Sequence, residues 1–145
     1  MDPDEGVVAI RTHVSTKCYG LEKPTKSPTV FRSGGTVMVG LWLENPPGQG
    51  PWEAGHARLV RLDAKGQPLE AARTLPVVLS AERLAPGGRG LAAVQWEEPP
   101  DAPAAAVRLE VEGSGGRGLR WERLEVPPPS AAGPRGKAAE AAWSR

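Results

Sequence analysis

Glycine and proline punctuate this chain so often that long helices are excluded. The 145 residues include 18 glycines and 16 prolines, which are spread between short apolar runs and not gathered in one tract. Such residues end regular elements and supply turn conformations. The pattern therefore predicts about seven or eight short strands closed by turns. We expect an all-β protein, namely an antiparallel two-sheet sandwich of immunoglobulin-like or fibronectin-like type.

The positions of the expected strands follow from the apolar runs. They are 6–14, 30–32, 36–44, 57–62, 75–79, 91–96, 105–112 and 119–126. Turn signatures separate several of them, at 33–35 (SGG), 63–66 (DAKG) and 85–88 (APGG). The segment 15–28 contains two prolines, which favours a loop or an edge segment over the interior of a sheet.

The segment 36–44 is the longest apolar run, and both of its faces carry apolar residues. This pattern is typical of a strand inside a stack of sheets. We therefore expect Trp42, Trp96 and Trp121 to be the largest side chains of the core. Truncating a buried Trp costs about 3–5 kcal/mol, so Trp42→Ala is predicted to leave the domain marginal or unfolded. Because Cys18 is the single cysteine, no internal disulfide can compensate.

The last expected strand has a fault in its alternation. Leu119 and Trp121 fall on one face, whereas Leu124 and Val126 fall on the other. One extra residue near 122–123 would restore the phase, which predicts a β-bulge at that point.

Three prolines at 127–129 should end strand pairing, because they favour an extended polyproline conformation. The predicted organisation is therefore an N-terminal extension at 1–5, a β-sandwich domain at 6–126, and a disordered Pro/Ala-rich tail at 127–145.

The charge and hydropathy of the chain limit its partners. The formal net charge is +1, so no field of one sign exists to attract nucleic acid or an anionic membrane. No apolar run approaches the roughly 20 residues of a membrane span, and we expect no membrane insertion. The opening residues MDPDEG lack an apolar segment, which predicts no signal peptide and a cytoplasmic location for the chain as written. The sequence predicts no particular oligomeric state.

Motifs for catalysis or cofactor binding are weak. The segment 113–118 fits G-x-G-x-x-G, but too few residues follow to complete a dinucleotide-binding unit, so we expect a flexible hairpin turn. His13 and His56 lack metal-ligand spacing. Cys18 near His13 is interpreted as a bystander thiol. We therefore predict no catalytic residues, no metal ligands and no cofactor, and we expect a protein that is not an enzyme.

Glu97, Glu98 and Asp101 form a small acidic segment. Paired carboxylates can transfer protons or bind calcium. However, Pro99 and Pro100 interrupt the regular ligand offsets of a calcium loop, so we interpret the segment as a solvated loop.

The loop after the long apolar strand holds the candidate binding residues Asn45, Trp52 and His56. An exposed Trp52 could anchor a partner. The alternative, which we favour, is that Trp52 folds over the end of the sandwich.

The leading functional hypothesis is a β-sandwich module with a protein-interaction or structural role. The partner would be a protein that the sequence does not identify. The alternative is a small-ligand or carbohydrate-binding sandwich that uses exposed Trp side chains as stacking platforms. An enzyme would need a polar cluster assembled from distant segments.

Three segments are distinctive: VGLWLENPPGQGPW at 39–52, LPVVLSAERLAPGGRGLAAV at 75–94 and VRLEVEGSGGRGLRWERLEV at 107–126. On the basis of these three segments, the chain resembles the C-terminal domain of a myxobacterial paralogous family, domain of unknown function 2381. The resemblance runs from about Glu5 to Val126, and WLENP followed by a Trp is its most specific element. Similar proteins are usually longer, with a signal peptide and an additional N-terminal part, so the resemblance implies a bacterial protein and export of those longer members. It implies no catalytic residues.

Overall fold

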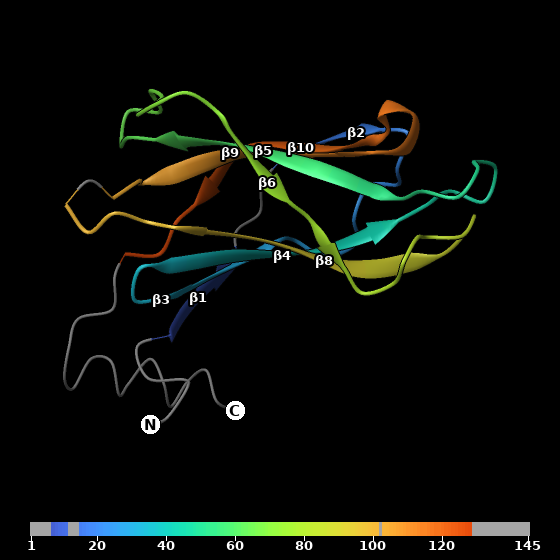
Figure 1. Cartoon of the computed structure of the whole chain (residues 1–145), viewed down its shortest axis with the longest axis horizontal. Helices are drawn as coiled ribbons and strands as arrows, with labels where there is room; N and C mark the ends of the chain where they lie inside the picture. The colour runs from blue at the N-terminus through green and yellow to red at the C-terminus, as the bar shows by residue number, and fades with distance from the viewer. Residues whose placement is uncertain (1–6, 12–14, 102, 129–145) are drawn as a thin grey trace.

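The computed structural model describes residues 7–11, 15–101 and 103–128. Two antiparallel sheets of five strands each pack face to face (Figure 1). The first sheet has the order β1 (Val7–Arg11), β3 (Thr29–Ser33), β4 (Thr36–Glu44), β8 (Arg89–Glu97), β7 (Val78–Leu79). The second sheet has the order β2 (Thr16–Tyr19), β10 (Gly118–Glu125), β9 (Ala106–Gly113), β5 (Ala54–Leu62), β6 (Arg73–Pro76). The predicted all-β, two-sheet sandwich is confirmed.

The described residues form ten strands, more than the expected seven or eight, for two reasons. Part of the segment 15–28 forms β2, an edge strand of the second sheet. The run 75–79 contributes to two strands, because β6 ends at Pro76 and the chain then crosses to the first sheet as β7. The helical content of the described ranges is one short 3₁₀ turn, η1 (Ser114–Gly116), and no helix there is long and apolar enough to cross a membrane.

The expected turns form as the sequence indicates. Gly66 N donates to the Asp63 carbonyl at 3.0 Å, and Gly88 N donates to the Ala85 carbonyl at 2.7 Å. Gly34, between β3 and β4, has a φ of +60°, a conformation that glycine adopts without steric cost. These local signals therefore fix where the chain reverses.

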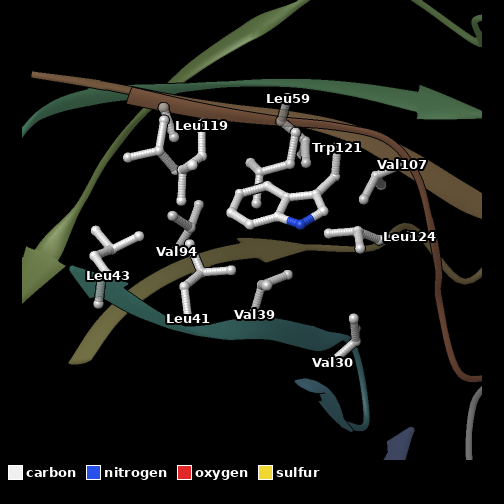
Figure 2. Packing of buried hydrophobic residues seen from close by; sticks show 14 of the residues in the cluster. Val30, Val39, Leu41, Leu43, Leu59, Val94, Val107, Leu119, Trp121 and Leu124 are labelled. Atoms are coloured by element: carbon white, nitrogen blue, oxygen red, sulfur yellow. The ribbon is translucent and has the colours of Figure 1, made fainter. Parts of the chain in front are cut away.

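Trp121 lies at the centre of the core, between the two sheets (Figure 2). Val39 and Leu41 approach it from the first sheet, and Leu59 and Leu124 from the second. Trp96 is also buried, so the prediction that these two tryptophans belong to the core is confirmed.

The prediction for Trp42 was wrong, because only one face of β4 is buried. Val37, Val39, Leu41 and Leu43 point inward, whereas Trp42 lies on the opposite face and is 36% exposed. A sandwich has two layers, and among the described residues no third layer covers the outside of the first sheet. Trp42→Ala is therefore no longer expected to unfold the domain, because that prediction depended on a buried Trp42.

The predicted bulge in the last strand is confirmed. Trp121 is registered with Leu109 and Leu124 with Val107, so β10 advances one residue more than β9 over this step. The extra residue returns Leu124 to the inward face.

The first residue of the predicted tail, Pro127, contacts the sandwich. Pro127 is buried, and its carbonyl accepts a hydrogen bond from Nη1 of the buried Arg32 at 3.3 Å. The predicted N-terminal extension at 1–5 and the tail from 129 onward lie outside the described residues.

Candidate functional site

Two of the predicted binding residues, Asn45 and Trp52, are buried at one end of the sandwich. They are 1% and 0% exposed, respectively. Trp52 exchanges two backbone hydrogen bonds with Leu84, and its Nε1 donates to the Arg117 carbonyl at 2.8 Å. Trp52 is therefore not available as an exposed anchor, and its burial fits the interpretation that it folds over the end of the sandwich.

Arg117 fastens the loops at this end to one another. Its Nη1 donates to Asn45 Oδ1 at 2.7 Å, and its Nη2 donates to the carbonyls of Gly50 (2.8 Å) and Pro51 (3.0 Å). Asn45 Nδ2 donates in turn to the carbonyls of Gly50 and Leu84. Arg117 lies in the 113–118 segment, which connects β9 to β10 as the predicted hairpin. The sequence did not predict this role, because an arginine in a glycine-rich turn gives no sign that its side chain hydrogen-bonds to other loops.

The third predicted residue, His56, lies on the outer face of β5 and is partly exposed, whereas Asn45 and Trp52 are buried. Its Nε2 is 3.7 Å from Glu112 Oε1, so the two groups attract only when the imidazole is protonated. Within the described ranges, no three His, Cys, Asp or Glu side chains gather closely enough to hold a metal ion. His13 lies outside those ranges. The predicted binding trio thus does not form one site.

Cys18 lies on β2 at the surface. Partial burial raises the pKa of its thiol, which outweighs the opposing effect of nearby Lys23. A raised pKa leaves less of the nucleophilic thiolate, and this is the opposite of what a catalytic cysteine needs.

Glu98, at the other end of the sandwich, is the clearest departure from the expected solvated acidic loop. It is only 2% exposed. Its carboxylate accepts hydrogen bonds from Trp96 Nε1 (2.7 Å), from Ala104 N (2.8 Å), and from Nε and Nη2 of Arg61 (2.9 and 3.0 Å). The predicted solvation was therefore wrong for Glu98, whereas Glu97 and Asp101 are exposed.

The partner of Glu98, Arg61, comes from the second sheet and is equally buried. Its remaining nitrogen, Nη1, donates to Glu70 Oε1 at 2.8 Å. Glu98 follows β8 of the first sheet, so the forked Arg61–Glu98 pair joins the two sheets. Each of the three guanidinium nitrogens of Arg61 donates to a carboxylate, and the Glu98 side chain is fully shielded from solvent, so the pair is suited to a structural role.

Acid should weaken this pair. Burial alone would raise the pKa of Glu98, but the hydrogen bonds from Arg61, Ala104 and Trp96 hold it below its ordinary value of 4.5. A carboxyl with a lowered pKa in the folded state contributes stability above its unfolded pKa, and that contribution is lost as the pH falls through the folded value. We expect the free energy of unfolding, measured by urea denaturation, to drop below about pH 4.5. Glu98→Gln should flatten that drop; an unchanged acid profile in the variant would contradict this assignment.

Part of the outer face of the first sheet is apolar. Trp42, Val78 and Leu91 are 36%, 67% and 44% exposed. Trp42 is registered with Leu91 on β8, and Val78 on β7 is registered with Ala93, two residues along β8 from Leu91. The exposed side chains therefore adjoin one another, and we call Trp42, Val78, Leu91 and Ala93 the outer apolar face.

The family described as "Protein of unknown function (DUF2381)" matches residues 6–124. The chain belongs to the DUF2381 family. No curated protein and no solved structure matches this DUF2381 member. The immunoglobulin-like type, the myxobacterial origin and the C-terminal placement therefore stay predictions.

Beside the outer apolar face, this DUF2381 member has a small hollow of about 60 Å³. It is lined by Thr25, Lys26, Trp42, Glu44 and Arg89. Lys26 Nζ stands 5.4 Å from the centre of the Trp42 ring, a cation–π distance. Small-molecule sites usually measure about 300–1,000 Å³, so this hollow can receive a side chain but cannot enclose a ligand.

Proposed function

We propose that this DUF2381 domain is a non-enzymatic interaction module that binds a partner protein through its outer apolar face. The observation that carries the proposal is the adjacency of Trp42, Leu91 and Val78, all exposed, on one sheet. Large contiguous apolar patches on a soluble surface are typical of interaction sites. Tryptophan is also among the residues that contribute most to binding energy at interfaces.

The surroundings of the face favour a protein over a small molecule. The adjoining hollow of about 60 Å³ suits a single inserted side chain. Around it, Lys26, Glu44 and Arg89 supply charges of both signs, which resembles the polar rim that surrounds an interface core. The partner we propose therefore presents an apolar surface, with one side chain packed against Trp42.

Strand addition would contribute little to this contact. The edge strand next to the face, β7, has only two residues. Short edge strands offer few unpaired backbone groups to a partner strand. The binding energy of the proposed complex therefore comes from side chains.

Trp42→Ala should separate binding from stability. We expect partner affinity to fall about 30-fold or more, because a central Trp at an interface contributes about 2 kcal/mol or more. We expect the free energy of unfolding to fall by only about 1–2 kcal/mol, since the side chain is already partly exposed. Affinity capture from a lysate of the native source, with the native chain and the variant as baits, identifies the partner, and titration of the purified partner gives both affinities.

Leu69→Ala is the matched control, because Leu69 is 41% exposed and lies away from the first sheet. It should leave binding unchanged. Equal loss of binding in both variants, or a partner whose hydrogen-exchange footprint avoids β4 and β8, would overturn the proposal. The outer apolar face could instead bind a second copy of the same chain, which sedimentation of the native chain alone tests. A dimer that forms with the native chain but not with Trp42→Ala would show self-association in place of a partner protein.

A second candidate function is carbohydrate binding, with Trp42 as the stacking platform. The observation in its favour is that Lys26, Glu44 and Arg89 place hydrogen-bonding groups beside an exposed indole. A glycan that changes the Trp fluorescence of the native chain but not of Trp42→Ala would favour this function. A protein partner alone would leave such titrations silent.

A further inference from the structure

The outer face of the second sheet holds a hollow lined by three arginines. Its volume is about 150 Å³, and its lining consists of Arg58, Val60, Ala72, Arg108, Glu110 and Arg120. Arg58 comes from β5, Arg108 from β9 and Arg120 from β10. The hollow therefore lies across three adjacent strands, on the side of the molecule opposite the outer apolar face.

Strand register explains why these charges converge. Arg58 is registered with Glu110, and Glu110 with Arg120, so the three residues form one row across β5, β9 and β10. Within the part of the chain that the structure describes, the side chains of Arg58 and Glu110 form neither a hydrogen bond nor an ion pair. The guanidinium of Arg58 thus carries unused donors at the wall of the hollow.

The other two arginines share one carboxylate. Arg108 Nε lies 3.1 Å from Glu122 Oε1, and Arg120 Nε lies 2.7 Å from Glu122 Oε2. Lys17 Nζ reaches the same carboxylate at 3.5 Å. Burial alone would raise the pKa of Glu122, but the positive charges of Arg120, Lys17 and Arg108 have the larger effect and lower it below its ordinary value, so Glu122 stays ionised.

The charges of this group do not cancel. Four positive groups (Arg58, Arg108, Arg120, Lys17) face two negative ones (Glu110, Glu122), which leaves a balance of +2. The whole chain has a formal net charge of only +1. Positive charge is therefore concentrated at this hollow.

We propose that the three-arginine hollow binds a doubly charged tetrahedral oxyanion, namely phosphate or sulfate, free or as the monoester of a ligand. Guanidinium groups hold such anions through paired N–H donors. The volume of about 150 Å³ is far above the roughly 10–15 Å³ that one water molecule needs, which leaves room for one such group. Arg58 supplies the unused donors, and Arg108 and Arg120 add positive charge from β9 and β10.

The test is calorimetric titration of the folded chain with inorganic phosphate at low ionic strength, where screening is weak. Arg58→Gln should weaken phosphate binding at least about tenfold, as expected for the loss of hydrogen bonds to a charged group. Glu110→Gln should tighten binding several-fold, because it removes a repelling carboxylate. Arg83→Gln is the matched control, since Arg83 is an exposed arginine outside the hollow, and it should bind phosphate as the native chain does.

Two further ligands identify the chemistry of the anion. Acetate, a planar monoanion, should bind more weakly than phosphate because it matches only part of the +2 balance. Glycerol phosphate should bind at least as well as inorganic phosphate if the natural ligand is a monoester, and more weakly if it is the free ion.

Three results would overturn the proposal: no phosphate binding by the native chain, equal binding by Arg58→Gln, or equal loss in Arg83→Gln, which would indicate unspecific charge attraction. If Arg58→Gln fails to fold, as judged by circular dichroism, Glu110→Gln decides the question. Tighter binding by that variant supports the site, and unchanged or weaker binding refutes it.

Discussion

Replacing Glu98 by alanine should lower the free energy of unfolding by about 3–5 kcal/mol, because it removes the buried carboxylate that balances a buried positive charge. Arg61 would lose both of its hydrogen bonds to this carboxylate, and the N–H groups of Trp96 and Ala104 would lose their acceptor. A domain of this size has a total stability of roughly 5–15 kcal/mol. The variant should therefore be marginal, which urea denaturation followed by circular dichroism will measure.

The neighbouring glutamate provides the control. Glu97 is exposed and accepts one hydrogen bond, from Thr36 Oγ1 at 2.8 Å, so Glu97→Ala should cost about 1 kcal/mol or less. The double variant Arg61→Met/Glu98→Leu should recover most of the stability lost in Glu98→Ala, since apolar replacement of a whole buried pair is often neutral or stabilising. A Glu98→Ala domain as stable as Glu97→Ala would refute the role assigned to the pair.

Trp52→Ala should have an effect of similar size. Trp52 is fully buried, and its removal leaves a large cavity and takes away one of the two hydrogen bonds that the Arg117 carbonyl accepts, while the bond from Gly113 N stays. Truncation of a buried Trp typically costs about 3–5 kcal/mol. Thermal unfolding should therefore show a sharp loss of melting temperature for Trp52→Ala and a small one for Trp42→Ala, the same substitution on the outer face.

Trp52→Phe separates the two contributions. Phenylalanine keeps much of the apolar volume but loses the indole hydrogen bond to the Arg117 carbonyl, which then accepts only from Gly113 N. Trp52→Phe should therefore destabilise the domain less than Trp52→Ala does. If Trp52→Ala were no more damaging than Trp42→Ala, the packing role of Trp52 would be excluded.

The architecture was predictable because its signals are local. Glycine and proline mark the turns, alternation marks the strands, and a shift in alternation marked the bulge between Trp121 and Leu124. The burial of Trp42 could not be judged in this way. Apolar residues occupy both faces of β4, and only the number of layers in the complete fold decides which face is covered.

The buried ion pair left a signal that the sequence interpretation overlooked. Ala92, Val94 and Trp96 point inward at every second position of β8, and the same period continues to Glu98. On β5, the inward series Ala57 and Leu59 continues to Arg61. A charge that falls in phase with a buried series, at a strand end, indicates a paired charge inside the protein.

The three-arginine hollow had no comparable signal. Arg58, Arg108 and Arg120 lie in three strands that are distant in sequence, and each reads as an ordinary outward residue of its own strand. Only the register between β5, β9 and β10 brings them together.

The pairing of the second strand also governs when this chain can fold. Within the described residues, β2 pairs only with β10, so Thr16 cannot pair until Trp121 has been synthesised. In the same way, Asn45 cannot accept its hydrogen bond until Arg117 has been synthesised. A ribosome makes the chain from its N-terminus, and contacts between such distant segments form slowly. The sandwich is therefore completed only once nearly all of it has been synthesised, and chains that end before β10 would expose the edge of β9 and the apolar core to aggregation.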